Sequence, residues 1–185
     1  MRTILLGALL AAAVTTTGFA QNEVNQRRKN QQNRIANGVQ SGQLTAGETA
    51  NLEKKESNLN KEIHADRKAN GGNLTNNEKK QINQQQNKLS NQIYNDKHNA
   101  NTATYGNNEV GARRQMQQDR IANGIRSGKL NAGETANLEK KESNLNKTIA
   151  SDRAANGGNL TNNQKKAINA RQNSISNQIY KDKNQ

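Results

Sequence analysis

Apolar residues recur at spacings of seven and four along most of the chain. Leu52, Leu59 and Ile63 form one such series, and Leu89 and Ile93 belong to another. On a helix of 3.6 residues per turn these spacings place the apolar side chains in a narrow stripe. The pattern predicts helices near residues 23–40, 46–69, 76–97, 109–126, 132–155 and 162–182, which pack along thin seams.

Polar residues just before each apolar series predict where the helices begin. A hydroxyl or amide residue is followed three positions later by Glu or Gln, as in a capping box, where the two side chains bond each other's backbone N–H groups. The predicted boxes are Thr45 with Glu48, Thr75 with Glu78, Asn131 with Glu134, and Thr161 with Gln164. Glycines that can end the preceding helix lie upstream, at Gly42, Gly71, Gly72, Gly128, Gly157 and Gly158.

The chain contains an internal repeat. The segment 48–61 recurs unchanged as 134–147, an offset of 134 − 48 = 86, and the same offset relates 22–24 to 108–110. A shorter shift of 74 − 44 = 30 relates Leu44-Thr45 to Leu74-Thr75. Such periods indicate repeated supersecondary units. We therefore expect an all-α fold, a tandem duplication of a roughly three-helix unit built from helix-loop-helix hairpins, with units at 22–98 and 108–185 and a linker at 99–107.

The first twenty residues have the pattern of a secretory signal peptide. Arg2 is followed by an apolar run from Ile4 to Val14 and by small residues before Gln21. A membrane anchor is the alternative, but the run is about half of the roughly 20 apolar residues that span a bilayer. We expect residues 1–20 to be removed and the protein to be periplasmic or secreted.

Composition limits what can hold the mature chain together. Removing Arg2 with the signal changes the formal net charge from +13 to 13 − 1 = +12, and the chain contains no cysteine. The mean hydropathy is −1.18. Little apolar surface is therefore available to offset the ordering cost of about 1.5 kcal/mol per residue. Either the fold is marginal or partners complete it, and seams that pair between chains in a homo-oligomer are one such arrangement.

The segments between the first and second helix of each hairpin resemble the second half of an EF-hand loop, in which a glycine, an apolar residue and a final glutamate recur. Counting back from Glu48 places Asn37, Val39 and Ser41 at the first, third and fifth loop positions, where calcium sites need acidic or amide oxygens. We expect EF-hand-like loops that lack calcium ligands, and no metal or cofactor. The alternative is a weak divalent-cation-responsive protein in which Glu48, Glu78 and Glu134 still contribute.

Two longer motifs carry a resemblance to a family. They are Arg34-Ile35-x-x-Gly38-Val39-x-Ser41-Gly42-x-Leu44-Thr45-x-x-Glu48 and the segment 90–98, Ser-Asn-Gln-Ile-Tyr-Asn-Asp-Lys-His. Together with their repeats, they resemble uncharacterised exported bacterial proteins over almost the whole mature chain. The resemblance implies an envelope or extracellular location and no known activity.

No arrangement of residues predicts a catalytic site. His64 and His98 correspond to Ala150 and Asn184 across the 86-residue offset, which favours isolated surface histidines. The carboxylates Glu53, Glu56 and Asp66 stand among lysines and arginines, and we interpret them as members of solvated polar faces. We expect a protein that is not an enzyme.

The strongly basic balance is the remaining functional signal. Candidate contacts to polyanions are the paired cations Arg27, Arg28, Lys29, Lys54, Lys55, Lys79, Lys80, Arg113, Arg114, Lys165 and Lys166. Clustered cations attract anionic polymers through salt-sensitive contacts, whereas aromatic platforms for stacking bases are missing. The sequence predicts a structural or interaction protein that presents a cationic helical surface to anionic envelope or matrix polymers or to another envelope protein, without sequence-specific nucleic-acid binding. Positive charge that only maintains solubility is the alternative.

Overall fold

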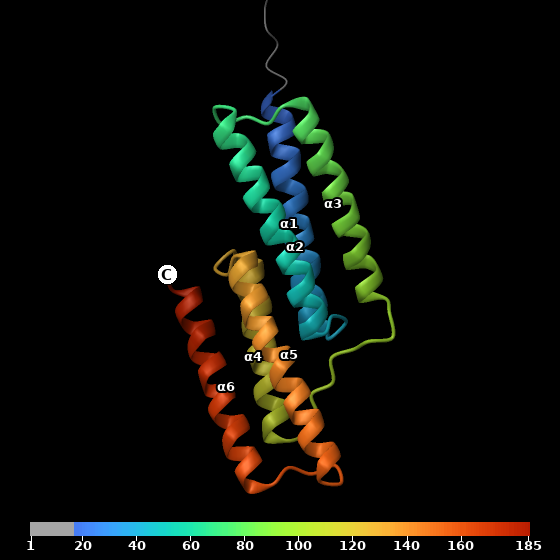
Figure 1. Cartoon of the computed structure of the whole chain (residues 1–185), viewed down its shortest axis with the longest axis vertical. Helices are drawn as coiled ribbons and strands as arrows, with labels where there is room; N and C mark the ends of the chain where they lie inside the picture. Colours follow the sequence, from blue (N-terminus) through green and yellow to red (C-terminus); the bar gives the residue numbers. More distant parts are fainter. Residues whose placement is uncertain (1–16) are drawn as a thin grey trace, which may run out of the picture.

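The structure, a computed structural model, describes the backbone of residues 17–185 and the side chains from residue 22 onward. The predicted signal peptide lies outside this range, apart from the backbone of residues 17–20. Within the range all regular structure is α-helical, and no strand occurs there, as the sequence predicts (Figure 1). The helices are α1 (Thr17–Ser41), α2 (Ala46–Ala69), α3 (Asn76–Lys97), α4 (Glu109–Ser127), α5 (Ala132–Ala155) and α6 (Asn162–Lys183).

The predicted caps set the helix starts. At α2 the Thr45 hydroxyl accepts a hydrogen bond from the Glu48 N–H at 3.3 Å, and the Glu48 carboxylate accepts from the Thr45 N–H at 2.9 Å. Reciprocal bonds of this kind satisfy N–H groups that have no partner inside the helix. The same pair of bonds begins α3, α5 and α6, so all four predicted capping boxes are confirmed.

The connections between helices are short and differ from the predicted EF-hand-like loops. Residues 42–45 join α1 to α2, and residues 70–75 join α2 to α3. Asn37, Val39 and Ser41, the counterparts of calcium-ligating loop positions, lie in the last turn of α1. The prediction of EF-hand-like loops is therefore wrong, because residues 37–41, the first five of the twelve-residue window, are helical. Gly42, with a φ of 72°, directly follows this helix.

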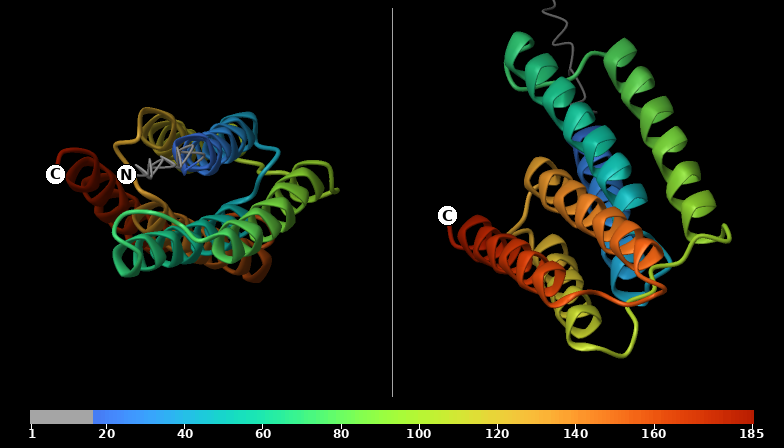
Figure 2. Two further views of the ribbon diagram at one scale, coloured as in Figure 1. Left: turned by 90° about the horizontal axis from the view of Figure 1, so that it is seen from above. Right: turned by 60° about the horizontal axis from the view of Figure 1, so that its bottom comes forward.

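The six helices form two layers. Helices α1 and α4 lie on one side, and α2, α3, α5 and α6 lie on the other (Figure 2, left). Within the first half of the chain α1 packs on α2 and α3, and within the second half α4 packs on α5 and α6. The halves meet where α1 packs on α4 and α2 packs on α5. Residues 99–107 connect them without regular structure longer than a turn.

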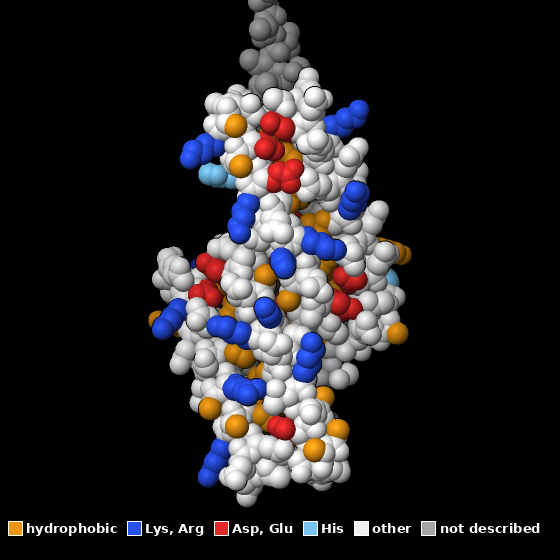
Figure 3. Space-filling view, viewed as in Figure 1, with side chains coloured by type: hydrophobic (Ala, Val, Ile, Leu, Met, Phe, Trp, Pro, Cys, Tyr) orange, Lys and Arg blue, Asp and Glu red, His pale blue; other side chains and the backbone are white. Residues whose placement is uncertain are grey.

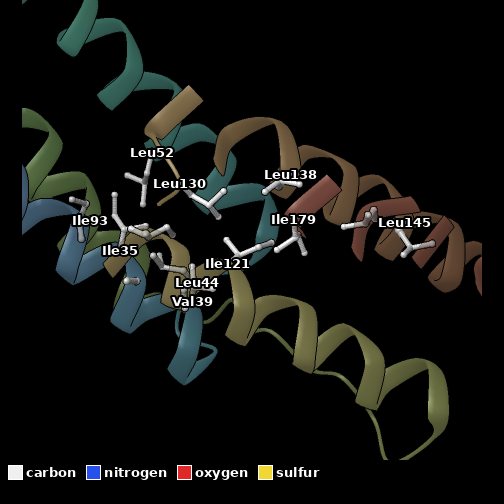
Figure 4. Packing of buried hydrophobic residues seen from close by; sticks show 14 of the residues in the cluster. Ile35, Val39, Leu44, Leu52, Ile93, Ile121, Leu130, Leu138, Leu145 and Ile179 are labelled. Carbon is white, nitrogen blue, oxygen red and sulfur yellow. The ribbon is translucent and has the colours of Figure 1, made fainter. Parts of the chain in front are cut away.

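One apolar cluster extends across both halves. Its members include Ile35 and Leu52 from the first half and Ile121 and Leu138 from the second, all with 0% exposure (Figure 4). A smaller cluster remains within the first half and consists of Val24, Leu59, Ile63, Leu74 and Ile82. Burial of each such side chain stabilises the fold by roughly 1.5–3 kcal/mol. The thin seams predicted from the sequence are therefore completed by packing within each half and between the two halves.

Several polar side chains occupy the seams, and here the sequence interpretation is wrong. Glu53 and Glu56, expected on solvated faces, both have 0% exposure, whereas Asp66 is half-buried. The spacing explains the burial of Glu56, because it lies four residues after Leu52 and three before Leu59, within the apolar stripe of α2. Glutamate thus replaces an aliphatic residue at a core position of this helix.

Candidate polyanion-binding surface

A shallow groove follows the contact between α2 and α5. Small residues form its floor and polar residues line its sides; those from α2 are Gly47, Ala50, Asn51, Lys54, Ser57, Asn58 and Lys61, and those from α5 are Gly133, Ala136, Asn137, Lys140, Ser143, Asn144 and Lys147. None of these residues is acidic. The groove faces away from α1 and α4, and Lys and Arg side chains follow the middle of this face over α2 and α5 (Figure 3).

The glycines fix how the two helices pair. A Cβ placed on Gly47 would lie 3.3 Å from the Ser143 Oγ atom, and one placed on Gly133 would lie 3.4 Å from the Ser57 Oγ atom. The early part of each helix therefore meets a later part of the other, so α2 and α5 run antiparallel. In this register, residues whose numbers add to 47 + 143 = 190 lie opposite each other. Leu52 and Leu138 satisfy the same sum and mark the centre of the crossing.

The register arranges four lysines in a row. Lys54 and Lys61 are two turns apart on α2, which separates them by about 10 Å along the axis, and Lys140 and Lys147 have the same separation on α5. Because Lys54 and Lys140 lie close to the centre on opposite sides, about 6 Å separates them along the axis. The row spans about 27 Å from Lys61 to Lys147.

The four ammonium groups are available to a ligand. All four lysines are exposed, and none is hydrogen-bonded or ion-paired within the part of the chain that the structure describes. Neighbouring amides and hydroxyls add donors and acceptors, but no aromatic ring lies in the groove. The groove therefore offers a linear array of positive charge with hydrogen-bonding groups, and no surface for stacking bases.

Several of the predicted cations have other partners. Arg27 donates to the side chains of Asn83 and Asn87, and Arg113 donates to Asn173 in the corresponding position of the second half. Arg28 interacts electrostatically with Glu56, and Arg114 does so with Glu142. The charges of Arg28 and Arg114 are therefore directed to the protein's own carboxylates, whereas Arg27 and Arg113 are held by neutral amides.

The other predicted cations do not form one patch. Lys79 and Lys80 lie at the start of α3 and Lys165 and Lys166 at the start of α6, which are opposite ends of the molecule (Figure 1). Lys55 donates to Gln92 at 3.1 Å, and Lys29 is exposed on α1.

Of the predicted residues, only Lys54 lies in the groove. The predicted contacts do not include Lys61, Lys140 or Lys147. Lys61 and Lys147 have no cationic neighbour in the sequence, whereas Lys140 is adjacent to Lys141 as Lys54 is to Lys55. The informative signal was a Lys-to-Lys spacing of seven on one helix, repeated at the 86-residue offset.

Buried carboxylates form the second unusual feature, but they face the interior. The Glu53 carboxylate accepts from the Gln32 amide at 2.9 Å, and the Glu139 carboxylate accepts from Gln118 at 3.0 Å. Burial raises the pKa of Glu53 to about 8, although the bond from Gln32 opposes the rise and Glu56 adds to it. Burial likewise raises the pKa of Glu139 well above its ordinary value.

The neighbouring pair behaves similarly. Burial raises the pKa of Glu56 to about 7 against the opposing charge of Arg28, and burial raises the pKa of Glu142 to about 7 against Arg114.

The residues described in the structure offer no metal site. Among them, no three His, Cys, Asp or Glu side chains are grouped so that they could hold an ion. The Glu48 carboxylate already accepts bonds from Thr45, Asn99 and Asn101, and that of Glu78 accepts from Thr75 and Asn70. These acids act as helix caps.

No protein-family model, curated protein sequence or solved structure matches this chain. The helices of the described residues are all too polar to cross a bilayer. The geometry of the groove is therefore the basis on which a function can be proposed.

Proposed function

We propose that this chain is an exported, non-enzymatic interaction protein that binds anionic envelope or matrix polymers along the α2–α5 groove. The observation that supports this function is the row of four exposed, unpaired lysines that extends about 27 Å without an acidic neighbour in the lining. An extended polymer can contact all four charges at once, and each contact releases a counterion. Binding should therefore be salt-sensitive and indifferent to monomer sequence.

The proposal includes a tandem duplication as the origin of the groove. Corresponding bonds recur at the 86-residue offset: Gln31 donates to the Gln86 carbonyl at 2.8 Å, and Gln117 donates to the Gln172 carbonyl at 2.8 Å. In the two related units, α2 and α5 are equivalent helices. Because they pair antiparallel, the lysines of α2 lie in line with the lysines of α5. Export follows from the pattern of residues 1–20, and periplasmic or extracellular polymers are the corresponding partners.

The test compares two variants with the same change in net charge. One replaces the four groove lysines Lys54, Lys61, Lys140 and Lys147 by Gln, and the control replaces Lys79, Lys80, Lys165 and Lys166 by Gln. Binding to heparin, used as a sulfated polysaccharide probe, is measured across a salt series. In a plot of log affinity against log salt concentration, the slope of the groove variant should be smaller in magnitude than that of the wild type by about 3–4. The slope of the control should change much less. Equal losses would show that net charge alone explains the binding and would reject the groove.

A further inference from the structure

The linker lies against both halves of the molecule. The Ala103 N–H donates to the Gly42 carbonyl at 2.8 Å, and Asn99 and Asn101 donate to the Glu48 carboxylate at 2.8 and 3.2 Å. Further along, the Tyr105 ring covers the Arg114 guanidinium, with 5.2 Å between the guanidinium carbon and the ring centroid. The extended segment 99–105 is therefore held by a carboxylate, a backbone carbonyl and the face of an arginine.

The 86-residue offset identifies a second set of the same three groups. The counterparts of Glu48, Gly42 and Arg114 are Glu134, Gly128 and Arg28. A groove on the other side of the molecule is lined by Arg28 and Gln32 of α1, by Asn60 of α2, and by Ser127, Gly128 and Asn131 at the turn between α4 and α5. The described residues leave this groove open.

Among the described residues, two differences distinguish this groove from the site that the linker occupies. Residues 17–20, the counterparts of 103–106, form the first turn of α1 and are not extended. In addition, Asn25 replaces Gly111, where a Cβ would lie only 2.0 Å from the Tyr105 carbonyl oxygen. Residues 17–20 thus do not follow the path that residues 103–106 take into α4, yet Arg28 and Gly128 still line the groove. The Glu134 Oε1 atom accepts no hydrogen bond from the described residues, because the cap at Asn131 uses Oε2.

We propose that the open groove beside Arg28 binds an extended, asparagine- and threonine-rich peptide segment of a partner protein through a tyrosine ring stacked on Arg28. The linker shows which chemistry fits: side-chain amides for the carboxylate, a backbone N–H for the glycine carbonyl, and an aromatic ring for the guanidinium. Because Asn25 blocks the path beyond the tyrosine, the bound segment turns away from α1 at that residue. This inference is independent of the polyanion groove, which shares no lining residue with the groove beside Arg28.

The probe is a capped nine-residue peptide with the sequence of residues 99–107, which carries no charged side chain. Its binding to the full-length protein is measured by fluorescence anisotropy, beside a second peptide with Ala in place of the tyrosine. We expect saturable binding of the first peptide and a loss of affinity of about tenfold in the second. Equal binding of the two peptides, or no saturation at millimolar concentrations, would overturn the proposal.

Protein variants locate the site without removing the charge next to Glu56. Arg28→Lys keeps that charge but loses the planar face, and it should weaken binding by about fivefold or more. Asn25→Gly removes the obstructing Cβ and should strengthen binding. The variant that lacks the four groove lysines should bind the peptide as the wild type does. Unchanged affinity in Arg28→Lys, weaker binding in Asn25→Gly, or loss of binding in the four-lysine variant would each contradict the assignment.

Discussion

The buried carboxylate of Glu53 should make the protein more stable in mild acid than in mild base. Gln32 of α1 donates a hydrogen bond to this carboxylate. Glu56 of α2 and Glu139 of α5 lie near it and carry like charge when ionised. Its pKa is about 8 in the folded protein, against an ordinary value of 4.5. The folded state therefore binds a proton that the unfolded state releases, so stability is fully present below pH 4.5 and is lost as the pH rises through 8.

The size of this contribution to the free energy of unfolding follows from the difference between the two pKa values. Each pH unit corresponds to about 1.4 kcal/mol, so the contribution of Glu53 between pH 4.5 and pH 8 is about 5 kcal/mol. Replacing Glu53 by Gln removes the ionisation and leaves a carbonyl oxygen that can accept from Gln32. The variant should unfold with about the same free energy as the wild type near pH 4.5 and should exceed it by about 5 kcal/mol at pH 9.

Urea unfolding monitored by circular dichroism at several pH values provides the measurement. Glu23→Gln, at an exposed position of α1, is the matched control and should follow the wild type at every pH. The reasoning would be refuted if the wild type became more stable between pH 5 and pH 8, or if the Glu53→Gln and wild-type curves ran parallel over that interval.

The remaining predictions concern the core, the linker and calcium. Leu52→Ala, at the centre of the helix crossing, should lower the free energy of unfolding by about 2–5 kcal/mol in urea titrations, whereas a loss under 1 kcal/mol would mean that the halves do not share a core. Gly111→Ala should lower the melting temperature, because the added Cβ would lie 2.0 Å from the Tyr105 oxygen; Gly133→Ala, where the contacts are 3.3 Å or more, should change it little, and equal effects would contradict the packing of the linker. Millimolar calcium should leave the melting temperature unchanged, because the Glu48 carboxylate is occupied by protein donors, and a clear rise would show a site that this geometry lacks.

Most of the secondary structure could be predicted because it depends on local chemistry. A capping box joins residues three apart, and a glycine that ends a helix acts within one turn, so Thr45, Glu48 and Gly42 mark their helices without reference to the rest of the chain. All predicted helix boundaries except the start of α1 agree with the structure to within one residue. Helix α1 begins at Thr17, six residues before the predicted start at residue 23.

The candidate site could be predicted only in part because it depends on the pairing of distant helices. Lys54 and Lys140 are 86 residues apart, and nothing local shows that α2 and α5 cross beside them. The same limitation explains the error at Glu53, whose burial is caused by α1 and α5. Glu56 differs, because its spacing from Leu52 and Leu59 already places it in the apolar stripe, although a glutamate favours a solvent-exposed position.

The core shared by the two halves has a consequence for assembly. A fragment limited to residues 22–98 would expose the face of α2 around Leu52 and could cover it only by meeting another molecule, so its folding would depend on dilution. In the full chain, the connection through residues 99–107 keeps the second face within reach at an effective concentration in the millimolar range. The short segment therefore turns an encounter between molecules into a step within one chain. The protein can complete its hydrophobic interior even where its own concentration is very low.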